Sequence, residues 1–370
     1  MTRKTGKKLP RKAAAPAAAG RAGAMGKGRV SARPGRAGAM GKGRVPARPG
    51  RAGEMAAAGQ AGETARRGNL LVLGSVALDS VKTPFGEVGE VLGGSAAFFA
   101  TAASYFTAVS VIAVVGDDFP ERHLNFLRQR DIDLTGLERR PGKTFRWRGE
   151  YSYQLNEAKT LDTQLNVFET FRPQVPASHQ SPDMLFLANI DPDLQRDVLG
   201  QVKRPRLVAC DTMNFWIEGK RDALFRLLKE VDVLVINDGE ARALGQNANL
   251  VAVARTILAA GPKTLIIKRG EYGVLMFTGD RVFAVPAFPL EEVKDPTGAG
   301  DCFAGGFMGY LARTGKLSED ALRRAVVYGS VMASFAVEAF SLDRLRGLEY
   351  KDIEARFGAF KQMTVFEELE

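Results

Sequence analysis

Short apolar runs alternate with longer amphipathic stretches along the chain after residue 68. Runs rich in Val, Ile and Leu, with apolar side chains at consecutive positions, predict strands that are buried on both faces. They lie at 69–75, 110–116, 184–189, 206–211, 231–237 and 264–268. Between them, 222–231 and 250–261 have apolar residues at helical spacing, and the second stretch ends at a glycine. The alternation predicts an α/β fold with a mostly parallel central sheet covered by helices on both faces, where ligands bind at the carboxyl ends of the strands.

One region breaks this alternation. Residues 144–170 are polar and aromatic, with near period-two patterning and without helix caps, which predicts antiparallel strands. Together with 80–94, these strands are expected to form a small β lid beside the main sheet. The pattern fits an ordinary edge hairpin equally well, so that alternative stays open.

The positive charge of the chain is concentrated in its first 68 residues. They hold 17 of the 52 Lys and Arg residues, but only Glu54 and Glu63 of the 42 acidic ones. Residues 69–370 therefore carry 35 basic and 40 acidic side chains, although the whole chain has a formal charge of +10. The net charge is thus no indication that the folded part binds nucleic acid.

A repeated unit fills much of the basic segment: GRAGAMGKGRVSARP at 20–34 returns almost unchanged at 35–49. With almost no large apolar side chains, the segment cannot offset the entropy of ordering and is predicted to be disordered. We therefore divide the chain into a disordered basic tail, 1–68, and one folded domain, 69–370. A solvated tail is the favoured interpretation, and weak, non-specific contact with nucleic acid is the alternative.

Several classes of protein are disfavoured by what the sequence lacks. No signal-peptide core or apolar run of membrane length occurs, which predicts a soluble, cytoplasmic protein without membrane contact. Two cysteines, Cys210 and Cys302, are too few for a disulfide framework or a thiolate metal site. With His123 and His179 as the two histidines, a histidine-based catalytic triad or zinc cluster is not expected.

The most informative stretch is DPTGAGD, Asp295 to Asp301, which stands before an amphipathic segment. Apolar residues four apart from Phe303 onward predict a helix that begins near Gly300 and holds Asp301 in its first turn. The free amides of a helix start attract anions, and small residues leave them accessible, so Gly298, Ala299 and Gly300 are predicted to form an anion hole. Asp301 beside it is placed to take a proton from a hydroxyl group. An acidic helix start whose glycines serve only packing is the alternative.

The stretch VKDPTGAGDCFAGGFMGYL at 293–311 resembles the C-terminal signature of the pfkB, or ribokinase-like, family of carbohydrate kinases. The resemblance extends over about 69–345 and implies a ribokinase-like fold. Members of this family transfer the γ-phosphoryl group of ATP to a hydroxymethyl group of a sugar, a nucleoside or a related alcohol. The resemblance implies that Asp301 is the catalytic base, that Gly298, Ala299 and Gly300 form the anion hole, and that Thr297 lies at the nucleotide. Asp295 heads a loop that binds a monovalent cation in many relatives, which makes K⁺ a candidate cofactor.

Other segments resemble the family's nucleotide and metal site. Asn237 and Glu240 match an N-x-x-E motif that helps to organise Mg²⁺ and the phosphates. Taken alone, Asn237 is better explained as the cap of the following helix. Lys268, Gly270 and Gly273 match a strand, turn and strand over the nucleotide, for which a plain hairpin is the alternative.

The segment CDTMN, which ends a predicted strand, is similar to the family's D-x-N motif through Asp211 and Asn214, with two residues between them instead of one. We assign these two residues no role from the sequence.

The acceptor side matches the family less completely. Asp79 follows the first predicted strand at the position where relatives bind substrate hydroxyls, and Gly93 and Gly94 resemble the first glycine signature. Ala77 and Phe98 stand where sugar kinases often carry Asn. Phe98 is thereby a candidate acceptor contact. With fewer hydroxyl partners and an aromatic ring, the pocket departs from that of a polyol kinase, which adds a nucleoside or a less hydroxylated alcohol to the candidate acceptors.

The resemblance therefore implies a phosphotransferase that moves the γ-phosphoryl group of MgATP to a sugar or sugar-like acceptor under a lid that excludes water. Two alternatives stay open: a nucleoside kinase of the same family, and a non-catalytic relative anchored to nucleic acid by its basic tail. The sequence is also compatible with a homodimer.

Overall fold

The computed structural model describes residues 68–365, so the predicted basic tail, apart from Gly68, lies outside the described residues. Within them, nine strands form one sheet. Their order is β13 (Arg281–Val285), β12 (Val274–Thr278), β11 (Thr264–Lys268), β10 (Val233–Asn237), β9 (Leu207–Cys210), β8 (Met184–Leu187), β1 (Asn69–Leu73), β4 (Ala108–Gly116) and β5 (Ile132–Arg140). All pairs from β5 to β11 are parallel, and β12 and β13 continue antiparallel at one edge. The predicted fold class is confirmed.

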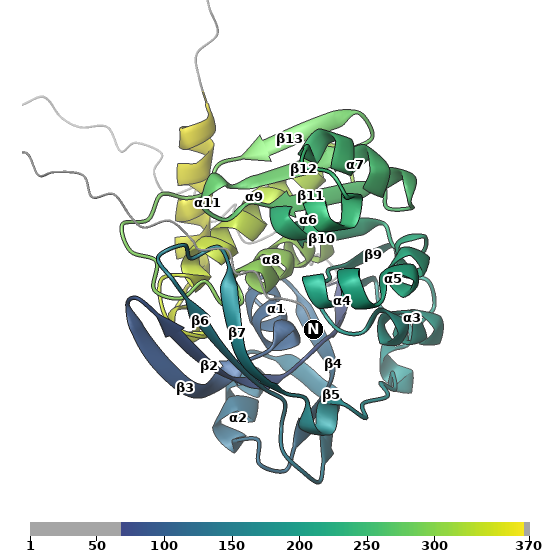
Figure 1. The fold of residues 1–370 in the computed structure, drawn as a ribbon, viewed down its shortest axis with the longest axis vertical. Coiled ribbons are helices and arrows are strands. Elements are labelled where there is room, and N and C mark those ends of the chain that lie inside the picture. The colour runs from purple at the N-terminus through teal and green to yellow at the C-terminus, as the bar shows by residue number, and fades with distance from the viewer. Residues whose placement is uncertain (1–67, 366–370) are drawn as a thin grey trace, which may run out of the picture. The chain divides into compact units, whose positions relative to one another are not determined.

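Both faces of this sheet are covered by helices (Figure 1). One face packs against α1 (Ser95–Ala103), α2 (Glu121–Gln129), α8 (Ala299–Thr314), α9 (Glu319–Ala336), α10 (Asp343–Arg346) and α11 (Tyr350–Thr364). The other packs against α3 (Pro192–Gln201), α4 (Asn214–Gly219), α5 (Arg221–Leu228), α6 (Asp238–Gly245) and α7 (Leu250–Ala259). In β1, Leu70 and Val72 enter the first core, whereas Leu71 and Leu73 enter the second. Side chains alternate across a strand, so a strand covered on both sides must be apolar throughout.

A second sheet of four strands lies beside the first in Figure 1. Its order is β3 (Gly86–Gly93), β2 (Ala77–Thr83), β6 (Arg146–Tyr151) and β7 (Ala158–Gln164). The β2–β3 and β6–β7 pairs are antiparallel, and β2 and β6 are parallel. The segments for which we predicted a lid thus pair with one another rather than with the main sheet. Most of β7 is exposed, in keeping with its polar sequence.

The remaining elements are short 3-10 turns at Asn166–Phe168, Ala177–His179 and Gly270–Tyr272. Across the part of the chain that the structure describes, no helix combines the length and the apolar character that a membrane span requires.

Candidate active site

The start of α8 lies where the DPTGAGD stretch predicts it. Gly298 is the residue before the helix and has φ +74°, in the left-handed region that side chains disfavour. A Cβ at this position would also collide with the ring of Phe98. The loop is therefore restricted to glycine by its backbone conformation and by its neighbour. Phe98 itself is 2% exposed, and its ring packs against this loop from α1.

Lys268, the last residue of β11, reaches the same loop. Its Nζ atom lies 2.6 Å from the place that a Cβ on Gly300 would occupy. An ammonium group thus stands directly beside the free amides of a helix start. Both features favour an anion, so the loop has the character of a phosphate site.

Asp301 lies in the first turn of α8, next to these groups. Burial raises the pKa of its carboxyl to about 7, Lys268 partly offsets this, and the charge of Glu240 adds to it. A base works best when its pKa is close to the operating pH. The environment of Asp301 therefore suits proton transfer near neutrality.

Asn237 and Glu240 form a capping box at the start of α6. The Glu240 amide donates to Asn237 Oδ1 and the Asn237 amide donates to Glu240 Oε2, both at 2.8 Å. The helix-cap interpretation of Asn237 is thus confirmed. Burial raises the pKa of Glu240, and Lys268 lowers it. Among residues 68–365, no group of three or more His, Cys, Asp or Glu side chains could hold a metal ion by itself.

Asp79 lies in β2 and is 6% exposed. The amide of Gly94 donates to its Oδ2 atom at 3.4 Å, and a Cβ on Gly93 would collide with the same carboxylate. Gly94 has φ +92°, which favours glycine. Gly93 is needed for space and Gly94 for its backbone conformation, and together they let the backbone approach Asp79. Burial raises the Asp79 pKa to about 7; the Gly94 amide lowers it, and the charges of Asp295 and Asp301 raise it. These two acids therefore lie near enough to Asp79 to act on it.

Asp295 is almost fully buried, at 1% exposure. Its Oδ1 accepts the amide of Thr297 at 2.9 Å and its Oδ2 accepts the amide of Ser341 at 3.1 Å. Burial raises the pKa of Asp295, and these hydrogen bonds lower it. Both carboxylate oxygens thus hold backbone, which ties the start of the anion loop to the segment after α9.

Gly270 and Gly273 flank the short turn between β11 and β12, at φ +53° and +81°. A Cβ on Gly273 would collide with the carbonyl of Val285, and one on Gly270 would collide with the Asn156 side chain. Asn156 belongs to the turn between β6 and β7, so the second sheet reaches the predicted nucleotide turn.

Two residues at this site had no predicted role. Tyr151, the last residue of β6, accepts a hydrogen bond from Thr297 Oγ1 at 3.3 Å. Asp211 follows β9, is 4% exposed, and its Oδ1 has no hydrogen-bond partner. Burial and the charge of Asp301 raise the pKa of Asp211 well above its usual value. The D-x-N resemblance pointed to Asp211, whereas no sequence signal separates Tyr151 from the nearby Tyr153.

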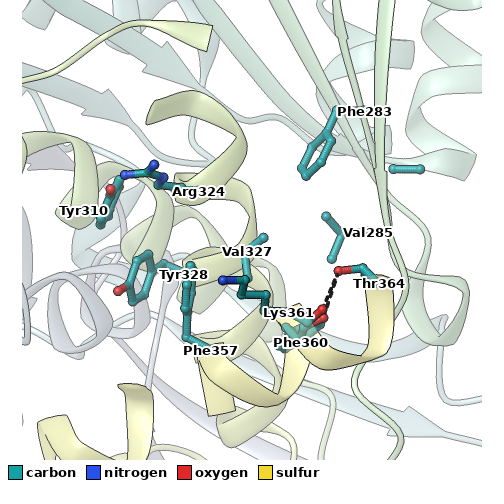
Figure 2. Close-up of a pocket in the computed structure, with 11 residues that line it drawn as sticks. Phe283, Val285, Tyr310, Arg324, Val327, Tyr328, Phe357, Phe360, Lys361 and Thr364 are labelled. Atoms are coloured by element: carbon teal, nitrogen blue, oxygen red, sulfur yellow. Dashed lines mark hydrogen bonds between the residues drawn. The ribbon is translucent and has the colours of Figure 1, made fainter. Parts of the chain in front are cut away.

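The structure thus brings Asp211, Glu240, Lys268 and Asp301 together, at the carboxyl ends of β9, β10 and β11 and the start of α8. A separate cavity of about 460 Å³ lies between β13, α8, α9 and α11 (Figure 2). Its walls include Phe283, Tyr310, Tyr328 and Phe357, and no predicted site residue lines it. The buried carboxylates and the anion loop, rather than this apolar cavity, mark the candidate active site.

Comparisons with known proteins agree with this arrangement. The model of the "pfkB family carbohydrate kinase" matches residues 62–341. A cytidine kinase of Thermococcus kodakarensis is 30% identical over 258 residues, which are 68% of this chain and 91% of the relative. The nucleoside kinase of Methanocaldococcus jannaschii has a TM-score of 0.63 at 19% identity, over 79% of this chain and 98% of its own. An E. coli protein assigned as a Ribokinase II, in complex with ATP and Mg²⁺, has a TM-score of 0.62 at 20% identity, over 80% and 99%.

The two solved structures support the ribokinase-like fold, and the family model covers well over half of the chain. The chain therefore belongs to the pfkB family of carbohydrate kinases and is a phosphotransferase.

Proposed function

We propose that this protein transfers the γ-phosphoryl group of ATP to a hydroxymethyl group of a nucleoside, with Asp301 as the base. One observation carries the proposal: the Asp301 carboxylate lies in the first turn of a helix whose Gly298–Gly300 start is accompanied by the Lys268 ammonium group. Base and anion site are thereby adjacent, as in-line phosphoryl transfer requires.

In the proposed reaction, Asp301 takes the proton of the acceptor hydroxyl as its oxygen attacks the γ-phosphorus. A new oxygen–phosphorus bond forms, the bond to the bridging oxygen breaks, and ADP leaves. The amides of Gly298–Gly300 and the Lys268 charge stabilise the negative charge on the transferring group. Asp301 then releases its proton to solvent.

The acceptor would lie beside Asp79, whose buried carboxylate is available to accept hydrogen bonds from hydroxyl groups. Ala77 and Phe98 offer no polar partners, which suits an acceptor with fewer hydroxyl groups and an apolar face. The T. kodakarensis relative is a cytidine kinase, so cytidine is the first acceptor to test. The four strands β2, β3, β6 and β7 would act as the lid.

Mg²⁺ fits this site. The ion usually keeps several waters and binds through one or two carboxylates plus substrate phosphates, so no complete protein cage is needed. The unpartnered oxygen of Asp211 and the carboxylate of Glu240 would hold it, directly or through water. When bound, the ion would neutralise charge on the phosphates. The E. coli neighbour with ATP and Mg²⁺ supports this assignment.

The test is an acceptor panel of cytidine, other nucleosides, ribose and fructose, with ADP release and phosphorylated product measured together. We expect a nucleoside to give the highest kcat/KM. Asp301→Asn should keep ATP binding but lower kcat by roughly 100- to 10,000-fold, the usual effect of losing a general base. Asp320→Asn is the matched control, because Asp320 is exposed in the first turn of α9. Near-normal turnover by a folded Asp301→Asn variant would contradict the assignment, and a preference for free sugars would replace the acceptor class.

A further inference from the structure

The end of β6 brings the second sheet into contact with the anion loop. The hydroxyl of Tyr151 accepts a hydrogen bond from Thr297 Oγ1 at 3.3 Å. Burial raises the pKa of Tyr151 to about 12, the bond from Thr297 lowers it, and the charges of Asp295, Asp79 and Asp301 raise it. The hydroxyl therefore stays protonated and lies within electrostatic reach of the acids on both sides of the proposed acceptor site.

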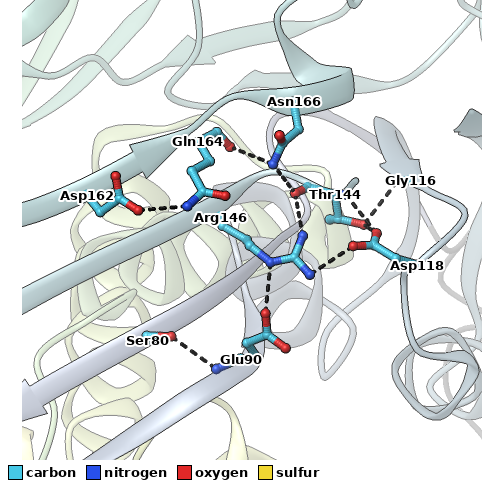
Figure 3. Close-up of polar contacts among 9 residues, drawn as sticks. All are labelled: Ser80, Glu90, Gly116, Asp118, Thr144, Arg146, Asp162, Gln164 and Asn166. Atoms are coloured by element: carbon cyan, nitrogen blue, oxygen red, sulfur yellow. Dashed lines mark hydrogen bonds and ion pairs between the residues drawn. The ribbon is translucent and has the colours of Figure 1, made fainter. Parts of the chain in front are cut away.

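The opposite end of the same strand is anchored by Arg146 (Figure 3). Its guanidinium group pairs with Glu90 of β3 at 2.8 Å and with Asp118, which follows β4 of the main sheet, at 2.8 Å. Asp118 also accepts the amide and the hydroxyl of Thr144 at 2.7 Å. The position of β6 is thus fixed against both sheets at its first residue, which holds its last residue over the loop.

A second contact lies just beyond Tyr151. The Asn156 side chain occupies the space next to Gly270, where any side chain on that residue would collide with it. The end of β6 and the turn that follows it therefore touch the loop before α8 at Thr297 and the predicted nucleotide turn at Gly270. Tyr151 makes the first of these contacts and Asn156 the second.

We propose that Tyr151 is a positioning residue that completes the acceptor site and keeps water away from the γ-phosphoryl group. The inference rests on the proposed function. A phenol that accepts a hydrogen bond from Thr297 still has its own proton to donate, and the acceptor supplies oxygen atoms to receive it. Its ring closes the site from the lid side, and exclusion of water by a closed lid directs the phosphoryl group to the acceptor.

Tyr153 provides a matched control two residues further along. It is 85% exposed and packs edge-on against Phe85, with ring centroids 6.5 Å apart. It has the same side chain and lies just after Tyr151, in the turn that follows β6, without the contact to Thr297. A general disturbance of this part of the lid should appear in substitutions at both tyrosines. Loss of the proposed role should appear only in substitutions of Tyr151.

The experiment compares wild type with Tyr151→Phe, Tyr151→Ala, Tyr153→Phe and Tyr153→Ala, using cytidine and ATP. The ratio of ADP released to cytidine phosphorylated is measured beside kcat and KM. Tyr151→Phe should raise the KM for cytidine about fivefold, the usual worth of one hydrogen bond. Tyr151→Ala should in addition raise the ADP-to-product ratio, because water enters the site. The Tyr153 variants should match wild type.

A double-mutant cycle tests the contact itself. If Tyr151 acts through Thr297, Thr297→Val combined with Tyr151→Phe should raise the KM for cytidine no more than the larger single effect. An unchanged KM for cytidine in Tyr151→Phe, or fully additive effects in the cycle, would overturn the inference. Tyr151→Phe retains the ring, so it remains informative if Tyr151→Ala fails to fold. If wild type phosphorylates no acceptor of the panel, the proposed function fails; if wild type transfers and Tyr151→Phe behaves like it, only the role of Tyr151 fails.

Discussion

At the scale of single residues, the carboxylates of the site lower the stability of the folded protein. Asp79, Asp211 and Asp301 are carboxylates whose pKa values are raised chiefly by burial. Their ionised forms are destabilised in the fold, because burial disfavours charge and neighbouring negative charges add to it. Among the residues that the structure describes, Lys268 is the one positive charge that lowers the pKa of Asp211, Glu240 and Asp301 alike. The buried carboxylates that serve the proposed function therefore lower the stability of the fold.

The pH dependence of unfolding should report this cost at Asp79. The unfolded chain ionises this group near its ordinary pKa of 3.8 and the folded protein near 7, so the fold holds a proton that the unfolded chain releases in between. Stability should fall as pH rises through this window, and the loss should be complete above about pH 7. Asn does not ionise, so Asp79→Asn should raise the free energy of unfolding at pH 8 by on the order of 1–4 kcal/mol, at about 1.4 kcal/mol per pH unit.

Urea unfolding of both proteins at pH 4 and pH 8 measures this effect. The two curves should nearly coincide at pH 4, where the folded protein keeps Asp79 neutral. Asp320→Asn, an exposed replacement in the first turn of α9, should change either curve by no more than about 0.5 kcal/mol. A variant that is less stable than wild type at pH 8 would contradict the proposed cost, whereas its acceptor binding should still be impaired.

How far single residues could be predicted depends on how local their geometry is. Asp301 and Gly298–Gly300 were identified because a glycine loop before a helix is encoded within a few consecutive positions. Tyr151 was missed because its position follows from the pairing of β6 with β2, which joins residues far apart in the chain. Neither composition nor periodicity distinguishes Tyr151 from Tyr153.

At the scale of elements, the beginnings of two helices carry the site. The loop before α8 requires glycine at 298, where φ is +74° and the Phe98 ring is in contact. Gly298→Ala should lower the free energy of unfolding by roughly 1–3 kcal/mol and should strongly reduce kcat, because the loop must move to accommodate the Cβ. Gly358→Ala is the matched control in α11, where a Cβ meets nothing within 4 Å. It should add up to about 1 kcal/mol of stability and leave kcat unchanged; equal behaviour of both variants would contradict the loop's role.

At the start of α6, one substitution can remove the charge of Glu240 and keep its role in the helix cap. Gln also serves in a capping box, so Glu240→Gln should preserve the cap and stability within about 0.5 kcal/mol. The same change removes a carboxylate from the proposed metal site, and the Mg²⁺ concentration for half-maximal rate should rise severalfold. Asp238→Asn, also in the first turn of α6, is the control. An unchanged Mg²⁺ requirement would leave Glu240 with a purely structural role.

Elements buried on both faces were the easiest to predict. The six apolar runs all form strands of the main sheet; 222–231 overlaps α5, which begins one residue earlier, and 250–261 contains α7. β5 was missed, because its alternating exposure reflects an edge strand with charged residues such as Glu138 and Arg140. Periodicity detects burial, and β5 is only half buried.

At the scale of the whole molecule, we propose that catalysis belongs to the part of the chain after residue 67. The carbonyl of Gly68 accepts a hydrogen bond from Thr107 Oγ1 at 2.6 Å, so this residue should be retained in a truncation. Deleting residues 1–67 should leave kcat and acceptor KM within about twofold, since distant changes without shared partners act independently. It should remove any salt-sensitive DNA binding, because residues 69–370 are net acidic. Loss of activity in a folded truncated protein, or undiminished DNA affinity, would show that the tail takes part.

The place of β1 in the sheet has a consequence for how the chain folds. β1 is a central strand, and its neighbours are β4 and β8. Leu70 pairs with Met184, more than one hundred positions later, so β1 lacks one of its neighbours until half of the protein has been synthesised. Long-range parallel pairing is slow to form, and until then the unpaired apolar strand has an exposed edge that is prone to aggregation. Nascent chains that stop before β8 should therefore depend on chaperones, because β1 still lacks one of its two neighbours.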